Sequence, residues 1–93
     1  MKVETTKRFL KQFLKCPKEI QNDVSFLLDE ISIATNLHQI NNIKKLQGYK
    51  NYYRYKKGSW RVGMELEENV VVICIIHAIG KRGDFYNYFP PNK

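Results

Sequence analysis

The feature that most constrains the fold is a change of hydrophobic period about halfway along the chain. Between residues 7 and 31, apolar residues recur every three or four positions, which is typical of amphipathic helices. From Tyr52 onward the side chains alternate with a period of two, and the run "VVVICIIHAI" (residues 70–79) is almost continuously apolar. The sequence therefore predicts an α+β fold, with helices first and an antiparallel sheet after them.

The first half of the chain predicts a short strand followed by a helical hairpin. "MKVETT" alternates like a strand, and Thr5 or Thr6 can cap the helix that follows. Pro17 ends this first helix and suits the first turn of a second one. The expected apolar faces are Phe9, Leu10, Phe13 and Leu14 in the first helix, and Ile20, Val24, Leu27, Leu28 and Ile31 in the second.

The second half predicts a three-stranded antiparallel meander. Residues 52–57 and 60–67 form a hairpin around Gly58-Ser59, and a turn at Glu68-Asn69 leads into a central strand that ends at Ile79 and turns at Gly80. Before the hairpin, apolar residues at intervals of three over residues 37–46 predict an irregular helical turn, which Gly48 breaks. A chain of 93 residues is expected to form one domain, residues 1–93.

The net positive charge of the chain indicates which classes of partner it can bind. The chain has 16 Lys and Arg against 9 Asp and Glu, a net charge of +7, which favours a polyanion such as nucleic acid, an acidic protein or an anionic membrane surface. The stretch between Ile31 and Met64 holds seven cations and no acid. These cations are Lys44, Lys45, Lys50, Arg54, Lys56, Lys57 and Arg61. Such a block is a candidate anion-binding surface.

The two cysteines indicate neither a disulfide nor a metal site. Cys16 and Cys74 lie far apart without CxxC spacing, and Cys74 falls within the apolar run, where a thiol is usually a small buried hydrophobe. With no secretory signal and no apolar run long enough to cross a bilayer, we expect a reduced, cytoplasmic location and no membrane contact.

Strand alternation divides the basic stretch "NYYRYKKGSWRVG" between two faces. Arg54 and Lys56 project to one side, and Arg61 can lie near Lys56 across the turn, so that three cations could hold a phosphate. The competing interpretation is a solvated face of a half-exposed sheet. The neighbouring aromatic side chains, Tyr52, Tyr53, Tyr55 and Trp60, are expected to pack rather than to stack on bases. Antiparallel order would bring the end of the last strand beside this hairpin.

The order and spacing of "KKLQGYKNYYRYKKGSWRVG" and "GKRGDFY" resemble the RelE/ParE superfamily of bacterial type II toxins, and specifically its RelE-like mRNA interferase branch. The resemblance covers nearly the whole chain and implies a compact two-layer fold. It also implies an endoribonuclease that cleaves mRNA in the ribosomal A site without a cofactor. The implied partners are the ribosome, mRNA and a cognate antitoxin protein.

The resemblance also implies the site. The catalytic candidates are Arg54, Lys56, Arg61, Arg82 and Tyr86, with Lys45, Lys50, Lys57 and Lys81 as RNA-binding cations. Tyr88 is the rival for the tyrosine, because the spacing of the family's terminal motif varies. Lys81 stands where some relatives have histidine, and Arg54 where the RelE type has lysine. His77 is a second-rank candidate, since a histidine within an apolar strand is more often hydrogen-bonded structure than a catalyst.

The sequence is also compatible with two alternative functions. A ParE-like inhibitor of DNA gyrase would share the fold, although that branch generally lacks the full catalytic set. A non-catalytic basic module would bind RNA phosphates in a salt-dependent way. For the nuclease, tyrosine and arginine titrate far from neutral pH, at about 10 and above 12, so we expect catalysis to depend mainly on how the ribosome positions the mRNA.

Overall fold

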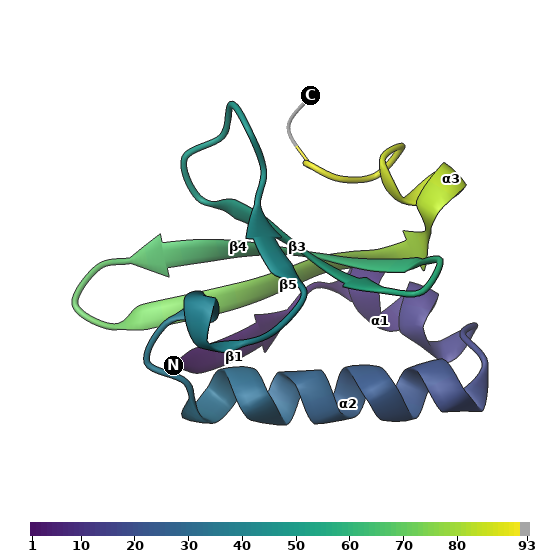
Figure 1. Cartoon of the computed structure of the whole chain (residues 1–93), viewed down its shortest axis with the longest axis horizontal. Coiled ribbons are helices and arrows are strands. Elements are labelled where there is room, and N and C mark those ends of the chain that lie inside the picture. The colour runs from purple at the N-terminus through teal and green to yellow at the C-terminus, as the bar shows by residue number, and fades with distance from the viewer. Residues whose placement is uncertain (92–93) are drawn as a thin grey trace.

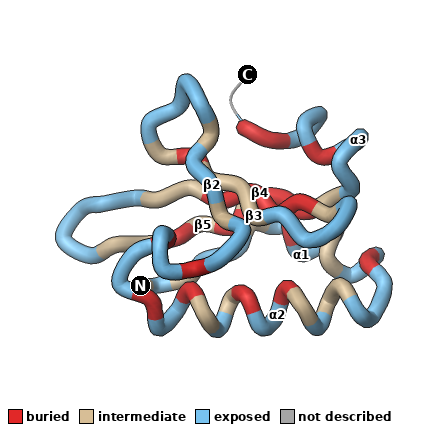
Figure 2. The backbone as a smooth tube through the Cα atoms, viewed as in Figure 1, coloured by how far each residue is buried: buried red, intermediate tan, exposed pale blue. Residues whose placement is uncertain are grey.

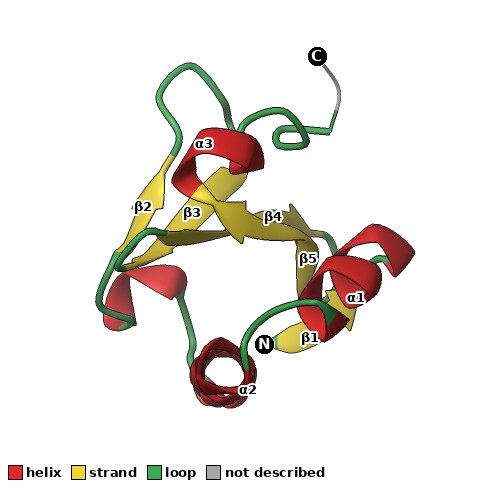
Figure 3. Cartoon of the chain, turned by 90° about the vertical axis from the view of Figure 1, so that its right-hand side faces the viewer, coloured by secondary structure: helices red, strands yellow, loops and turns green. Residues whose placement is uncertain are grey.

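The structure is a computed structural model that describes residues 1–91. In chain order its elements are β1 (Lys2–Thr5), α1 (Lys7–Leu14), α2 (Lys18–Ile33), the 3-10 turn η1 (Leu37–Gln39), β2 (Ile43–Lys45), β3 (Tyr52–Lys57), β4 (Trp60–Glu68), β5 (Val72–Lys81) and α3 (Arg82–Phe85). The strands form one sheet in the order β1-β5-β4-β3-β2. Helices α1 and α2 lie on one side of this sheet and α3 lies on the other (Figures 1 and 3).

The helices form where the sequence predicts them. The Thr6 hydroxyl accepts a hydrogen bond from the Phe9 amide at 3.1 Å and caps α1, while Pro17 is the N-cap of α2. The predicted apolar face of α2 is confirmed, because its buried positions face the sheet (Figure 2). The predicted face of α1 is only half right, since Leu10 and Leu14 are 46% and 74% exposed. Helix α1 packs mainly on β5, so only Phe9 and Phe13 reach the core.

The predicted meander is confirmed as β3, β4 and β5, with Gly58 at φ 57° in the hairpin turn. The last strand does not end at Ile79, because Gly80 and Lys81 still pair with β4. Strand β1 lies beside β5 and pairs with it in parallel, an arrangement that was not predicted from the sequence. The α+β class, with a strand and two helices before the meander, is confirmed.

The prediction of a helical turn over residues 37–46 is largely wrong. Only Leu37–Gln39 is helical, and residues 43–45 form β2, which pairs antiparallel with β3. Asn42 adopts φ 72°, a left-handed conformation that ends the turn, and its carbonyl accepts a hydrogen bond from the Lys56 amide. Pairing with β3 therefore outweighs the three-residue spacing of apolar side chains.

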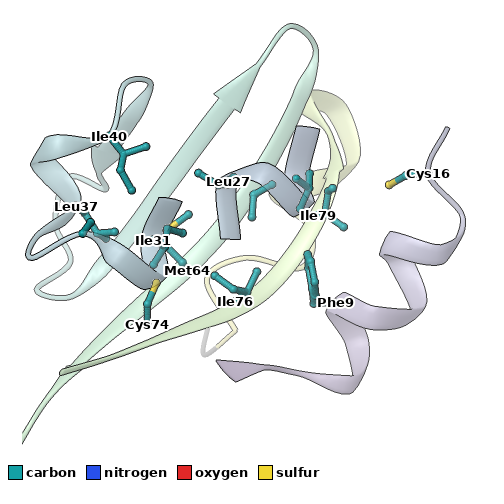
Figure 4. Packing of buried hydrophobic residues seen from close by; sticks show 13 residues of the cluster. Phe9, Cys16, Leu27, Ile31, Leu37, Ile40, Met64, Cys74, Ile76 and Ile79 are labelled. Carbon is teal, nitrogen blue, oxygen red and sulfur yellow. The ribbon is translucent and has the colours of Figure 1, made fainter. Parts of the chain in front are cut away.

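Two hydrophobic clusters hold the fold together. The main core lies between the sheet and the two long helices, and includes Phe9, Leu27, Ile31, Met64 and Ile76 (Figure 4). A smaller cluster lies on the opposite face of the sheet, and its members are Tyr52, Ala78, Phe85 and Phe89. The smaller cluster fixes α3 and the segment after it against the sheet.

Both cysteines are free and buried, and Cys74 has a consequence for stability at high pH. Burial raises the pKa of the Cys74 thiol from 9.0 to about 12. Between these values the unfolded chain loses the thiol proton and the native chain keeps it, so the free energy of unfolding should fall as pH rises, by up to about 1.4 kcal/mol per pH unit. Burial also raises the pKa of Tyr55, which acts in the same direction above pH 10.

Urea unfolding measured from pH 8 to pH 11 tests this prediction. The variant Cys74→Val keeps an apolar side chain at the buried position and should show a shallower decline than the parent chain. An equally steep decline in both proteins would show that the thiol does not cause it.

None of the helices formed by residues 1–91 has both the length and the apolar character needed to span a bilayer.

Candidate active site

The face of the sheet opposite α1 and α2, here called the basic face, carries Arg54, Lys56 and Arg61. Lys56 pairs with Arg61, which pairs with Gly80, and in the next row Arg54 pairs with Gly63. Residues directly opposite each other in antiparallel strands project to the same side. Tyr53 and Tyr55 project to the other side and pack on the main core. The predicted division of the basic stretch between two faces is confirmed.

The start of α3 lies beside the turn of the β3–β4 hairpin. The Arg82 amide donates to the Ser59 carbonyl at 2.8 Å, and Lys81 pairs with Trp60. Figure 1 shows this junction at one end of the molecule, where α3 leaves β5. The β3–β4 hairpin and the start of α3, two basic segments about twenty residues apart in sequence, therefore lie side by side, as antiparallel strand order predicts.

The cations of this region form no ion pair with an acidic group of residues 1–91. Among residues 1–91, ion pairs form only between Lys2 and Glu4 and between His77 and Glu65. Lys56 and Arg82 are exposed, and Arg54 is half-buried on the sheet. Since no carboxylate among residues 1–91 neutralises their charges, these cations are available to an anionic ligand.

Arg61 differs from the open phosphate-binding cation that the sequence suggests. Its residue is only 6% exposed, and its Nη1 donates to the carbonyls of Gly58 at 2.8 Å and Trp60 at 3.0 Å. These two hydrogen bonds hold the hairpin turn in place. The Ser59 carbonyl of the same turn accepts a hydrogen bond from the Arg82 amide. Arg61 therefore positions the turn, and only its Nε and Nη2 groups remain without a hydrogen-bond partner among residues 1–91.

The two candidate tyrosines have different neighbours. Tyr86 is the C-cap residue of α3, is 42% exposed and lies edge-on to Phe85 with ring centroids 4.9 Å apart. Tyr88 is 43% exposed, and the guanidinium of Arg8 from α1 stands 5.5 Å from its ring centroid. Tyr86 therefore packs on the smaller cluster through Phe85, whereas Tyr88 contacts Arg8 of α1.

The register separates the predicted RNA-binding lysines from the basic face. Lys45 pairs with Tyr53 and Lys57 with Trp60, so both project toward the side of the sheet that carries α1 and α2. Lys81 also pairs with Trp60, and Lys50 is exposed in the loop before β3. The RNA-binding roles of these four lysines stay predictions. Lys44 pairs with Arg54 and shares its face.

His77 is held in a polar network on the sheet. Its Nε2 lies 2.8 Å from Glu65 Oε1, and Glu65 Oε2 accepts from the Asn51 side-chain amide at 3.0 Å. The ring packs against Tyr52 and Phe89, and 17% of the side chain is exposed. These contacts agree with the structural interpretation of this histidine. Among residues 1–91, no three His, Cys, Asp or Glu side chains gather as a possible metal site.

Comparison with known proteins gives relatives that cover most of the chain. No family model matches. A protein named Toxin RelE3, from Methanocaldococcus jannaschii, is 32% identical over 92 residues, which cover 97% of this chain and 100% of the relative. Among solved structures, the RelB-RelE antitoxin-toxin complex from Methanococcus jannaschii matches with a TM-score of 0.75 and 29% identity, over 94% of this chain and 99% of the other. The archaeal RelE-RelB complex from Pyrococcus horikoshii has the same fold, with a TM-score of 0.72, 20% identity and 88% and 94% coverage.

Proposed function

Because the chain belongs to the RelE toxin family, we propose that it is the toxin of a type II toxin-antitoxin system and cleaves mRNA as a ribosome-dependent endoribonuclease. The observation that carries this proposal is the junction at the hairpin turn. There Lys56, the backbone of Arg82 and the start of α3 come together, and no carboxylate in the described chain neutralises the two exposed cations.

The proposed reaction uses the RNA 2'-hydroxyl as the nucleophile. A bond forms between the 2'-oxygen and phosphorus, the bond from phosphorus to the 5'-oxygen breaks, and the products are a cyclic phosphate and a free 5'-hydroxyl. One proton leaves the 2'-hydroxyl and one is added to the 5'-oxygen. Tyr86 takes the first proton, and Arg82 supplies the second or stabilises the charge on the leaving oxygen.

The phosphate gains negative charge as the reaction proceeds. Lys56 and Arg54 stabilise that charge, with Arg61 holding the turn and offering its two remaining donor groups. Cations that are already fixed in position when the charge develops are worth several kcal/mol of transition-state stabilisation. Lys56 and Arg54 project from a paired strand, which limits their motion more than a loop would.

A cognate antitoxin is the proposed protein partner. Two of the solved structures that share this fold are complexes of a RelE toxin with a RelB antitoxin. The net charge of +7, together with basic-face cations that form no ion pair among residues 1–91, favours an antitoxin with an acidic segment over the basic face. Binding there would cover Lys56 and Arg82 and block access of RNA.

The proposed function is tested by comparing cleavage of free mRNA with cleavage of the same mRNA bound to ribosomes. We expect efficient cleavage only on the ribosome, because positioning of the scissile phosphate supplies much of the rate. Arg82→Ala should abolish both cleavage and growth arrest, whereas Lys18→Ala, an exposed charge change at the start of α2, should affect neither. Equal rates on free and ribosome-bound mRNA would contradict the ribosome dependence. Growth arrest with DNA breaks and intact mRNA would instead identify gyrase as the target.

A further inference from the structure

A pocket of about 280 Å³ lies around the end of β5, between the C-terminal end of α1 and the segment that contains α3. Its lining includes Gln12, Lys15, Trp60, Lys81, Asp84 and Tyr88. The volume is close to the lower end of ligand-binding pockets, about 300 Å³. In Figure 3 this end of the molecule faces the viewer, with α1 and α3 on either side of the sheet. We call it the end pocket.

Two aromatic side chains from distant parts of the chain line the end pocket. Trp60 is half-buried and reaches it from β4, while Tyr88 reaches it from the C-terminal segment. The Lys81 ammonium stands 5.7 Å from the centroid of the Trp60 ring. Aromatic rings accompanied by cations are the groups that bind the bases of single-stranded RNA, since stacking of one base is worth about 1–3 kcal/mol.

The polar groups of the end pocket suit a base more than a simple anion. Gln12 Oε1 accepts a hydrogen bond from the Ile79 amide at 3.0 Å, which fixes the side chain. Its Nε2 has no hydrogen-bond partner among residues 1–91, so it can donate to a ligand. Asp84, whose carboxylate forms no ion pair among residues 1–91, can accept from the amino group of a base. A carboxylate in the pocket disfavours a bare phosphate as the ligand.

The end pocket adjoins the basic face across the end of the sheet. Trp60 and Arg61 are consecutive residues on opposite faces of β4, and Arg82, whose amide donates to the Ser59 carbonyl, directly follows Lys81. An RNA strand whose phosphate lies at Lys56 and Arg82 could therefore place a neighbouring base beside Trp60. Lys15 and Lys81 would meet the phosphate attached to that base.

We propose that the end pocket binds one nucleobase of the mRNA, next to the phosphate that is cleaved. The inference rests on the proposed function for its choice of substrate, but it concerns a separate set of contacts. It assigns base recognition to Trp60, Gln12 and Asp84, and it predicts that the enzyme prefers some bases at this position over others, because the pocket offers both a fixed donor and an acceptor.

NMR titration of the intact protein tests the inference directly, because Trp60 is the only tryptophan and gives a single indole N–H signal. The probes are a dinucleotide with a 2'-O-methyl group, which cannot be cleaved, and ribose 5-phosphate, which has no base. We expect the dinucleotide to shift the Trp60 indole and Gln12 amide signals in a saturable way, and ribose 5-phosphate to leave them in place. Lys15→Ala should weaken dinucleotide binding severalfold, while Lys18→Ala, an exposed lysine outside the pocket, should bind like the parent chain.

Equal shifts with both probes, or equal affinities of the Lys15→Ala and Lys18→Ala variants, would overturn the inference. The result is independent of the cleavage assay. Cleavage of ribosome-bound mRNA without base-dependent shifts would leave the proposed function intact and remove the pocket from it. Base-dependent shifts in a protein that cleaves no mRNA would support the pocket and contradict the nuclease.

Discussion

Tyr86→Phe is expected to lower the rate of cleavage of ribosome-bound mRNA by a factor of about 100 or more, the usual contribution of a general base or acid. The substitution removes one oxygen atom and keeps the ring that packs edge-on against Phe85. Tyr86 is 42% exposed, so the loss of its hydroxyl should leave the free energy of unfolding almost unchanged. Single-turnover cleavage and urea unfolding of the same protein samples provide the two measurements.

Tyr88→Phe is the matched control for that prediction. Tyr88 lies two residues further along and is 43% exposed, nearly the same as Tyr86. Each variant therefore removes one phenolic oxygen from a similarly exposed tyrosine. Tyr88→Phe keeps the ring that lies beside Arg8 and lines the end pocket, and it removes only a hydroxyl that the proposed reaction does not use, so we expect this variant to keep most of the activity. A large loss in Tyr88→Phe with an active Tyr86→Phe would reverse the assignment of the catalytic tyrosine.

The local parts of the fold could be predicted from the sequence, and the long-range parts could not. A period of two, with Gly58-Ser59 at its centre, is a local signal, and it gave the β3–β4 hairpin with its register. The parallel pairing of β1 with β5 joins residues about seventy positions apart and leaves no local pattern. Strand β2 was missed for a related reason, because its three residues become a strand only through their pairing with β3.

The same distinction applies to the site. Alternation within β3 was sufficient to place Arg54 and Lys56 on one face, away from Tyr53 and Tyr55. That Lys44, and not Lys45, shares the face of Arg54 depends on the register of β2, a neighbouring strand that was not predicted. The conformation of a long side chain is harder still to foresee, since nothing in "GSWR" indicates that Arg61 turns back onto the carbonyls of its own hairpin.

Gly63→Ala is expected to destabilise the protein by about 1–3 kcal/mol, the usual cost of overfilling a packed core. A β-carbon at this position would lie 2.6 Å from Cγ and Cδ1 of Phe89 and 2.8 Å from Cζ of Phe85, closer than carbon atoms can approach. Both phenylalanines are fully buried against the sheet. The added methyl group must therefore push the C-terminal segment away from β4, and we expect the cleavage rate to fall because Tyr86 directly follows the displaced Phe85 and packs on its ring.

Gly83→Ala separates this effect from the general consequence of adding a methyl group to glycine. A β-carbon on Gly83 would have no atom within 4 Å, and Gly83 lies within α3, where alanine is favoured over glycine by about 0.5–1 kcal/mol. Urea unfolding should therefore show a loss of stability for Gly63→Ala and a small gain for Gly83→Ala. If both variants unfold at the same urea concentration as the parent chain, the C-terminal segment does not need its packing on Gly63. The position of Tyr86 must then be set by other contacts.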